Sequence, residues 1–183
     1  MVNFSKIFTE IRSHLKDKNK VVTTFFDYYG IFYKHGFYNY NEAKLEQGNA
    51  RIGVDLLERG MTEYLNEKGV NTRNFIPYIQ LHEFEALLFS SDEGFEFMYD
   101  DPYVLREFKR VRNRFPNPED INDSPQTSPS HRIINELELR GDKYVKTSDG
   151  ESIATFIGID VMIENCPRFA QWVESLVDKI NSI

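Results

Sequence analysis

The sequence predicts an α/β domain that has a small, mainly parallel central sheet flanked by helices and a helical C-terminal part. Two runs of β-branched and aromatic residues, 20–27 and 75–80, lie on either side of a long stretch with helical periodicity at 42–67. Strand, helix and strand in this order form a right-handed crossover, which brings the carboxyl ends of both strands to one edge of a sheet. Beyond residue 90 the patterns are mostly those of helices.

Length and composition define the broad class of protein. We expect the 183 residues to form a single α/β domain, with a sheet-forming part at 1–115 and, at 116–183, an acidic loop followed by a helical closing part. Hydrophobic residues make up 40% of the chain and charged residues 28%, so the chain can build a packed core and is not disordered by composition.

Charge and cysteine content bear on partners and location. The net charge of -7 argues against nucleic-acid binding over a broad face, which needs a basic surface, but it leaves a local basic groove open. Cys166 is the only cysteine, which excludes an internal disulfide and fits a reducing cytoplasm. The sequence contains neither an apolar run long enough to span a membrane nor the pattern of a signal peptide. We therefore expect a soluble, cytoplasmic protein with no membrane partner.

The first part of the chain leads to a candidate acid. Apolar side chains recur at helical spacing and predict an amphipathic helix at 3–17. The run at 20–27 predicts a buried strand with Asp27 at its carboxyl end. Asp27 has two interpretations there: it is a turn or N-cap residue, or it is a ligand of Mg²⁺, which prefers oxygen donors.

A loop and a long helix separate the two predicted strands. The loop at 28–40 is rich in Tyr, and its rings either pack back on the domain or stack on a base or a partner. Asn41 is the predicted cap of the helix at 42–67, and Gly69 is predicted to end it.

The central stretch is 75–89, where a strand pattern changes into helical spacing. His82, Glu83 and Glu85 lie at the change, and ligand sites in open α/β sheets collect at the carboxyl ends of strands. On a helix His82 and Glu85 share one face, whereas in an extended chain Glu83 and Glu85 do. Either arrangement turns an acid toward the site, beside an imidazole that can move a proton or bind a metal. The alternative is a helix N-terminus with favourably placed acids.

Two later segments contain candidate binding residues. A helix predicted from Pro102 to residue 115 carries five basic residues that face either a phosphate or solvent, namely Arg106, Lys109, Arg110, Arg112 and Arg114. The loop at 116–130 is rich in turn residues, and we expect it to border the site through Glu119, Asp120, Asn122 and Asp123. Ser130 is the predicted cap of the next helix, whose first residues, His131 and Arg132, suit either anion binding or an ordinary helix start.

Several common catalytic and cofactor-binding motifs are absent from the sequence, which argues against some classes of enzyme. The segment 143–148 is weakly extended in pattern, and closing helices are predicted at 152–156, 160–165 and 167–180. The sequence has no phosphate-binding P-loop, no dinucleotide glycine fingerprint, no paired-cysteine zinc motif and no nucleophile elbow. ATP hydrolysis, structural zinc and α/β-hydrolase chemistry are therefore disfavoured.

Four strings of this sequence resemble a bacterial domain-of-unknown-function family, family 4276. They are TTFFDYYG at 23–30, FIPYIQLHEFEALLFS at 75–90, PEDINDSP at 118–125 and SPSHRI at 128–133. The resemblance covers most of the chain, and the second and third strings are the most specific. It implies a relation to Toprim domains, the Mg²⁺-binding α/β fold of topoisomerases, primases and related nucleases.

The resemblance also implies roles for individual residues. The implied catalytic residues are Asp27, on the Toprim acidic strand, with His82, Glu83 and Glu85. The implied ligands of Mg²⁺ or Mn²⁺ are Asp27, Glu83, Glu85, Glu119 and Asp123. The resemblance places Asn122 and Arg132 in a third polar cluster with Glu119 and Asp123. We expect Asn122 and Arg132 to bind the substrate together with Arg110 of the basic helix and His131 of the helix start. Family members usually carry a further strand with a Glu-Gly pair ahead of the segment that starts here. We therefore expect either a truncated gene or an incomplete active centre.

Two functions follow as expectations. Because members of the family often lie beside genes for ATPases of the SMC or ABC type, the resemblance implies a Toprim-like, Mg²⁺-dependent nuclease-type module in an anti-phage defence or DNA-processing system. Its substrate would be nucleic acid, and its partner such an ATPase. The alternative is a non-catalytic binding or regulatory subunit of the ATPase, with the Tyr-rich loop and the basic helix as its interface.

Overall fold

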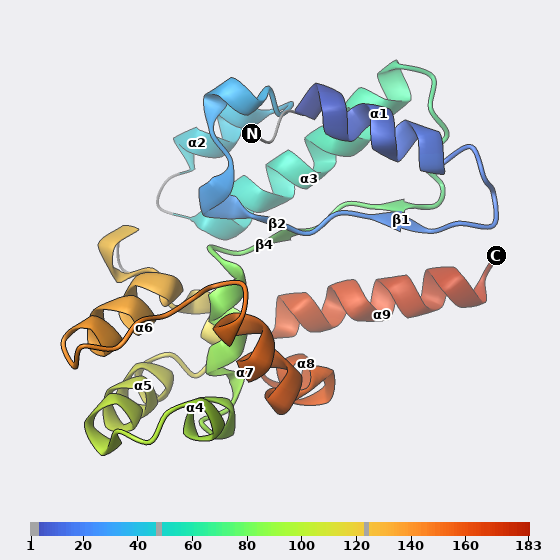
Figure 1. Ribbon diagram of the computed structural model, residues 1–183. Coiled ribbons are helices and arrows are strands. Elements are labelled where there is room, and N and C mark those ends of the chain that lie inside the picture. The colour runs from blue at the N-terminus through green and yellow to red at the C-terminus, as the bar shows by residue number, and fades with distance from the viewer. Residues whose placement is uncertain (1–3, 47–48, 123–124) are drawn as a thin grey trace. The chain divides into compact units, whose positions relative to one another are not determined.

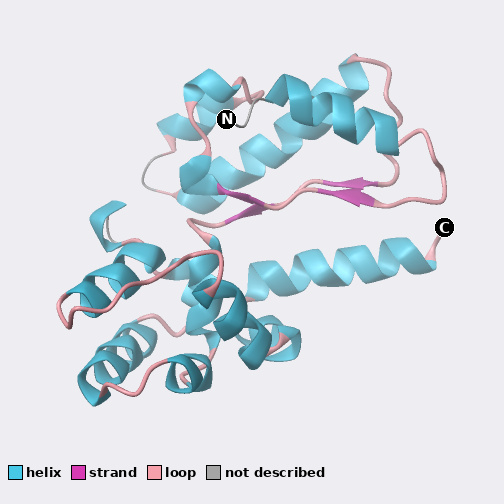
Figure 2. Cartoon of the chain, viewed as in Figure 1, coloured by secondary structure: helices cyan, strands magenta, loops and turns pink. Residues whose placement is uncertain are grey.

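The computed structural model describes residues 4–46, 49–122 and 125–183 (Figures 1 and 2). The chain divides into two compact units. Unit 1 comprises Met1–Leu81 and Trp172–Ile183, and unit 2 comprises His82–Gln171. The predicted α/β class with a helical C-terminal part is confirmed, because unit 1 contains short parallel strand pairs and unit 2 is built from helices.

The strands of unit 1 pair as a parallel crossover predicts. β1 (Val22–Thr23) pairs with β3 (Phe75–Ile76), and β2 (Phe26–Asp27) pairs with β4 (Ile79–Gln80), both in parallel. Asp27 therefore lies beside Gln80 in the ladder. Gln80 in turn is two residues before His82 in the chain.

The expected continuous strand at 20–27 is wrong, because it is interrupted between β1 and β2. Pro77 lies in the gap of the partner strand and has no N–H to donate. In this gap the Thr24 hydroxyl replaces the missing backbone hydrogen bonds. Its Oγ1 accepts from the Tyr78 N–H at 2.9 Å and donates to the Tyr78 carbonyl at 3.0 Å. A buried side chain thus satisfies both polar backbone groups of one residue where the proline breaks the backbone pairing.

The helices of unit 1 differ from the prediction in one respect. α1 (Phe4–His14) lies within the predicted range, but the single helix expected at 42–67 is wrong, because it is two helices, α2 (Tyr40–Leu45) and α3 (Ala50–Glu67). Asn49 caps α3 by accepting from the Ile52 N–H at 3.4 Å, so the true cap lies eight residues beyond the predicted Asn41. Gly69 ends α3 as predicted, with φ 71°.

The Tyr-rich segment between β2 and α2 contains two short 3₁₀ turns, η1 (Tyr28–Gly30) and η2 (Tyr33–His35). Some of its rings pack on the domain and others are exposed to solvent, so each predicted alternative describes part of the segment. Tyr28 is buried, whereas the side chains of Phe32 and Tyr33 are 53% and 72% exposed.

Apolar side chains from α1 and α3 cover one side of the unit 1 strands, and α9 (Pro167–Asn181) contributes Trp172 on the other side (Figure 1). Trp172 stacks on Tyr78 with ring centroids 4.6 Å apart, and its Nε1 donates to Thr23 Oγ1 at 2.8 Å. The fully buried centre on the α3 side is Val54, Leu57, Met61, Leu65 and Ile79. Leu45 is 84% exposed and belongs to the separate helix α2.

Unit 2 is organised around the buried 3₁₀ segment η3 (Phe84–Ser90), which replaces the α-helix predicted to follow the second strand. The elements that pack on it are η4 (Pro118–Asp120), α5 (Pro102–Arg114), α6 (Pro129–Glu138), α7 (Asp149–Ile157) and α8 (Ile159–Asn165). The remaining elements are α4 (Glu93–Met98), η5 (Pro125–Thr127) and the first residues of α9.

The closing helices occur as predicted, but smaller expectations for this region are wrong. α6 begins at the N-cap Ser128, two residues before the predicted cap, because Pro129 suits the first helical position. The segment 143–148 forms turns and no strand. Phe156 is 48% exposed, and its ring stacks on that of Phe97 with centroids 4.4 Å apart. Across the residues that the structure describes, no helix has both the length and the apolar character required to cross a membrane.

Replacement of Thr24 by Val tests the hydroxyl bridge across the strand gap. We expect Thr24→Val to lower the free energy of unfolding by about 1–3 kcal/mol, because it removes two buried hydrogen bonds to Tyr78 with little change of side-chain volume. Thr9→Val is the matched control, since the Thr9 hydroxyl bonds the Ser5 carbonyl on the exposed side of α1. Urea unfolding measures both variants, and an equal loss in the two would contradict the bridging role.

Candidate functional site

Two acids of unit 2, the partly buried Glu83 and the buried Glu85, meet at one ammonium group. Glu83 is extended, with φ -145° and ψ 157°, and Glu85 follows in the first turn of η3. The Lys146 Nζ lies 3.3 Å from Glu85 Oε1 and 3.8 Å from Glu83 Oε1. The acid side chains are 4% and 13% exposed, whereas Lys146 is 50% exposed. The structure thus brings Glu83 and Glu85 to one ammonium group, although only Glu83 is extended and Glu85 lies in a 3₁₀ turn, so neither predicted backbone geometry holds for the whole segment.

The backbone at His82 directs the chain into this cluster. His82 is buried and has φ 67°, a left-handed conformation that is uncommon for a residue with a side chain. It lies between β4 and η3 at the change from strand to 3₁₀ helix. Such strain is often found at functional sites, where surrounding packing maintains it.

The Glu83 carboxylate binds the first turn of α6. Its Oε2 accepts a hydrogen bond from the Ser130 backbone N–H at 3.0 Å. Burial alone would raise the pKa of Glu83, but the Ser130 hydroxyl and N–H, the charge of Lys146 and the Ser128 hydroxyl together lower its pKa below the usual value. Glu83 is therefore ionised at neutral pH, at a helix N-terminus that favours negative charge.

Ser128 connects this carboxylate to the surface. Its buried hydroxyl interacts with Glu83 and lies 2.9 Å from Nδ1 of the exposed His131. The direction of the proton in this contact depends on the His131 tautomer. The three side chains form a chain of polar groups from a buried acid to solvent, and such a chain can move a proton.

Tyr144 lies near both acids, and Tyr99 lies near Tyr144. Burial raises the pKa of Tyr144, and the charges of Glu85, Asp149 and Glu83 add to the rise together with Tyr99. Burial likewise raises the pKa of Tyr99. Both hydroxyls are buried and have no hydrogen-bond partner among the described residues, and both remain protonated donors at neutral pH. A donor of this kind, with acids near it, is suited to a neutral acceptor such as a water molecule.

Gly150 makes room for one of these hydroxyls. A Cβ at position 150 would lie 2.8 Å from the Tyr144 oxygen, so no larger residue fits without a shift. Sequence reasoning missed both Tyr144 and Lys146. The only available signal was a Tyr and a Lys two residues apart in a loop, which is too common a pattern to indicate a site.

Glu119, a predicted metal ligand, has a different partner in the structure. It is fully buried, and its two oxygens accept from the backbone N–H groups of Arg168 at 2.8 Å and Phe169 at 3.1 Å. It thereby caps the N-terminus of α9. Burial raises the pKa of the neighbouring Cys166, and the Glu119 charge adds to the rise.

The other predicted ligands are distributed over the chain. Asp27 belongs to unit 1, where it ends β2 and makes no capping hydrogen bond to η1 with its side chain. Asp123 lies outside the described residues, and the neighbouring Asn122 has a buried side-chain oxygen. Within residues 4–46, 49–122 and 125–183, no group of three or more His, Cys, Asp or Glu side chains is placed to hold a metal ion.

Two predicted substrate-binding residues lie in one cavity. A hollow of about 240 Å³ between α5 and α6 is lined by Arg110 and Arg132, together with Arg114, Glu107, Val111, Gln126, Thr127, Asn135 and Glu136. The Arg132 Nε donates to the Thr127 carbonyl at 2.7 Å. Because Arg132 is two residues after Ser130, the first turn of α6 contributes both to the acid cluster and to this hollow.

Fold and site together define an α/β protein with a carboxylate pair at one ammonium group and an adjacent arginine-lined hollow. The chain belongs to the family described as Domain of unknown function (DUF4276), whose model matches residues 2–177. Searches of curated proteins and of solved structures found no match.

The acid cluster predicts a pH dependence of stability. The pKa of Glu83 is lower in the folded chain than the reference value of 4.5, so the unfolded state binds more protons as the pH falls below that value. The Glu83 contribution is therefore complete above pH 4.5 and is lost as the pH falls toward the folded-state pKa. We expect the difference in melting temperature between wild type and Glu83→Gln to shrink over this range.

Glu96→Gln is the control for this measurement, because Glu96 is an exposed acid on α4. Melting curves at several pH values compare the three proteins. A wild-type advantage over Glu83→Gln that stays constant down to pH values well below 4.5 would show that Glu83 is not held by its neighbours as the contacts indicate.

Proposed function

We propose that this protein is a bacterial, Toprim-like module that cleaves phosphodiesters with the help of Mg²⁺ or Mn²⁺, in an anti-phage defence or DNA-processing system with an SMC- or ABC-type ATPase. The observation that carries the proposal is the convergence of two carboxylates, the partly buried Glu83 and the buried Glu85, on a single ammonium group. Two acids that share one cation are an arrangement in which a divalent cation can replace the ammonium.

The donor chemistry of the pair fits Mg²⁺. This ion usually binds through one or two carboxylates and completes its shell with water and substrate phosphates, so it needs no larger protein cluster. Lys146 lies on a loop and is half-exposed, so its ammonium can leave the pair. Glu83 and Glu85 would hold the ion, and Glu119 is engaged at α9.

An ion held by Glu83 and Glu85 would supply charge stabilisation for the phosphate and would lower the pKa of a coordinated water. The chain's own residues do the rest. Ser130 and Ser128 hold Glu83 ionised. His131, at the surface end of the polar chain, is placed to exchange a proton with solvent. Arg110 and Arg132 bind a phosphate in the hollow between α5 and α6. The catalytic roles of Asp27 and His82 stay predictions from the resemblance.

Metal binding tests this proposal directly. We expect millimolar Mg²⁺ or Mn²⁺ to raise the melting temperature of the wild type, since a ligand at about 100 times its dissociation constant stabilises the folded state by about 2.7 kcal/mol. The double variant Glu83→Gln/Glu85→Gln should lose this stabilisation, whereas Glu96→Gln should keep it. Absence of a shift in the wild type, or an equal shift in the double variant, rejects the metal site.

The alternative is a non-catalytic partner of an ATPase. It is favoured by the exposed rings of Phe32 and Tyr33 in unit 1, which are large apolar groups outside any core. Binding of the purified ATPase encoded beside the gene distinguishes the two functions. Binding that is lost in Phe32→Ser/Tyr33→Ser but kept in Glu83→Gln/Glu85→Gln, in a protein without strand cleavage, would favour the alternative.

A further inference from the structure

The loop that connects α6 to α7 contacts the acid pair through a lysine. We call residues 142–148 of this loop the strap, and each of them except Tyr144 is exposed. The strap carries Lys146, whose Nζ lies 3.3 Å from Glu85 Oε1 and 3.8 Å from Glu83 Oε1. These ion pairs join an exposed loop to acids that lie far away in the sequence.

Other contacts fix the two ends of the strap. Just before its start, the Arg140 guanidinium lies 5.0 Å from the Tyr103 ring of α5, and the Asp142 N–H donates to a carbonyl group of α6 at 3.0 Å. Toward its end, the Val145 N–H donates to the side chain of Asp149, in the first turn of α7, at 2.7 Å. These hydrogen bonds run to the helix on either side. Within the part of the chain that the structure describes, no backbone hydrogen bond ties the strap to η3.

Side chains therefore attach the strap to the acid pair. Tyr144 has its hydroxyl buried beside Gly150, but this hydroxyl finds no hydrogen-bond partner among the described residues. The polar attachment comes from Lys146, whose side chain is 50% exposed. An ion pair that is open to solvent on one side contributes modestly to stability and is screened by salt. The strap is thus held in place by a contact that another cation can replace.

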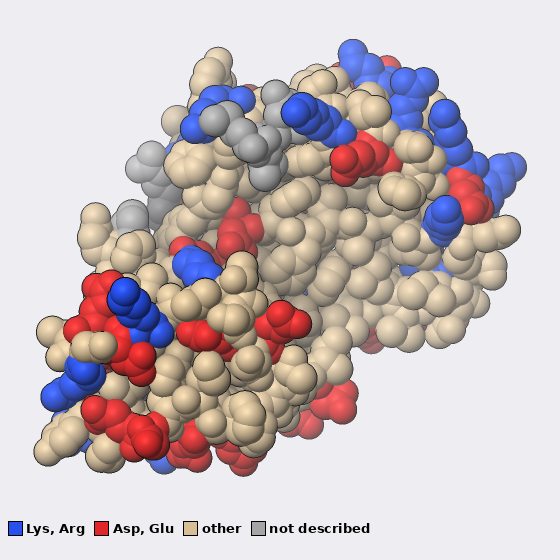
Figure 3. Space-filling view, in the orientation of Figure 1, with Lys and Arg blue, Asp and Glu red and all other residues tan. Residues whose placement is uncertain are grey.

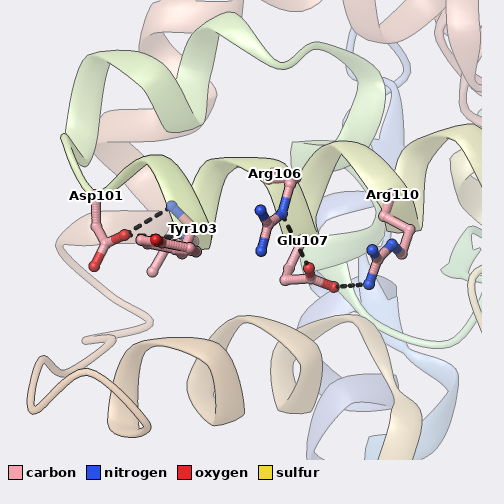
Figure 4. Close-up of polar contacts among 6 residues, drawn as sticks. Asp101, Tyr103, Arg106, Glu107 and Arg110 are labelled. Carbon is pink, nitrogen blue, oxygen red and sulfur yellow. Dashed lines mark hydrogen bonds and ion pairs between the residues drawn. The ribbon is translucent and has the colours of Figure 1, made fainter.

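The ion pairs of α5 show the contrast. Glu107 lies 2.7 Å from Arg110 and 3.6 Å from Arg106, and all three residues belong to one helix (Figure 4). Loss of these pairs would release no segment, because the helix is held by its own backbone hydrogen bonds. The pairs of Lys146 instead connect two elements, so their loss frees a loop.

The charge of unit 2 favours the entry of a cation. The segment 82–171 contains 18 Asp and Glu residues and 10 Lys and Arg residues. On the face in view in Figure 3, the Asp and Glu side chains of α4–α8 are prominent. A net negative charge raises the local concentration of cations. A divalent cation carries twice the charge of an ammonium group, so it competes with Lys146 for the two carboxylates.

We infer that the strap is a lid held closed by Lys146, and that a divalent cation bound by Glu83 and Glu85 opens it. The inference rests on the proposed function and adds a regulation of the same site. The ion and the ammonium repel each other, so they do not share the two carboxylates. When the ion binds, Lys146 turns to solvent, the Tyr144 ring is uncovered, and the acid pair becomes open to a substrate phosphate.

Chymotrypsin reports the state of the strap, because it cleaves after tyrosine and the Tyr144 hydroxyl is buried when the strap is closed. Cleavage between Tyr144 and Val145 is followed by mass spectrometry, at a protease concentration where the rate follows the population of the open form. Each rate is divided by that of the peptide 140–150 with the same sequence, which removes the intrinsic preference of the protease.

The first comparison is made in EDTA and needs no metal ion. We expect Lys146→Met to be cleaved at Tyr144 about fivefold faster than the wild type, because it loses a partly exposed ion pair. Lys143→Met is the matched control. It removes the same charge from the strap, but Lys143 makes no ion pair with the described residues, so it should be cleaved like the wild type.

The second comparison adds millimolar Mg²⁺. The cleavage rate of the wild type and of Lys143→Met should rise to about that of Lys146→Met, whose own rate should not change. Lys146→Met should also bind Mn²⁺ about fivefold more tightly than the wild type, measured from the electron paramagnetic resonance of the free ion. The two factors agree because a closed strap lowers the apparent affinity by the fraction of open molecules.

Each contrary result overturns a defined part of the inference. Equal cleavage of Lys146→Met and Lys143→Met in EDTA rejects the role of Lys146 in holding the strap. Stabilisation of the wild type by Mg²⁺ without faster cleavage at Tyr144, or weaker Mn²⁺ binding by Lys146→Met, rejects opening by the ion. Absence of stabilisation by Mg²⁺ rejects the proposed metal site and opening by the ion with it. Because the comparison in EDTA judges the closed strap by itself, the two failures are distinguishable.

Discussion

The contact between the Glu83 carboxylate and the first turn of α6 is the interaction on which the candidate site depends. It satisfies a backbone N–H of a helix start and stabilises the ionised acid inside unit 2. The same turn carries Ser128, His131 and Arg132. One hydrogen-bonded junction therefore connects a partly buried negative charge, a path to solvent and an arginine-lined hollow.

The acids in the interior of unit 2 have two different roles, one structural and one that is a candidate for function. Glu119 has its two oxygens bonded to the start of α9, so its charge is compensated by backbone groups that no ligand can replace. Glu83 and Glu85 instead share a half-exposed lysine, a partner that can be exchanged. Glu85 and Glu119 are both buried, but they differ in what they can bind. Glu85 can exchange its lysine for another cation, whereas Glu119 is held by backbone N–H groups.

Local patterns predicted much of the fold. The parallel pairing of the two strand regions, the end of α3 at Gly69, the start of α5 at Pro102 and the closing helices follow from side-chain periodicity and from the backbone limits of Gly and Pro. Two predictions were wrong, the continuous strand and the single long helix, and each error has a local cause that side-chain periodicity does not reveal. Pro77 splits the ladder because a missing N–H on one strand interrupts its partner as well, and Asn49 starts a new helix where periodicity appeared continuous.

The sequence by itself determined the fold class, the secondary-structure boundaries set by Gly and Pro, and the candidacy of Glu83, Glu85, Arg110 and Arg132, because these depend on residue type and spacing along the chain. Only the tertiary structure decided which charges meet. Lys146 and Tyr144 join the acids, Glu119 joins a helix start, and Arg140 joins Tyr103 across a helix pair. The physical reason is that electrostatic and hydrogen-bond energies depend on distances in space, and the packing of η3 against α6 and the loop at 142–148 sets those distances across dozens of residues of sequence.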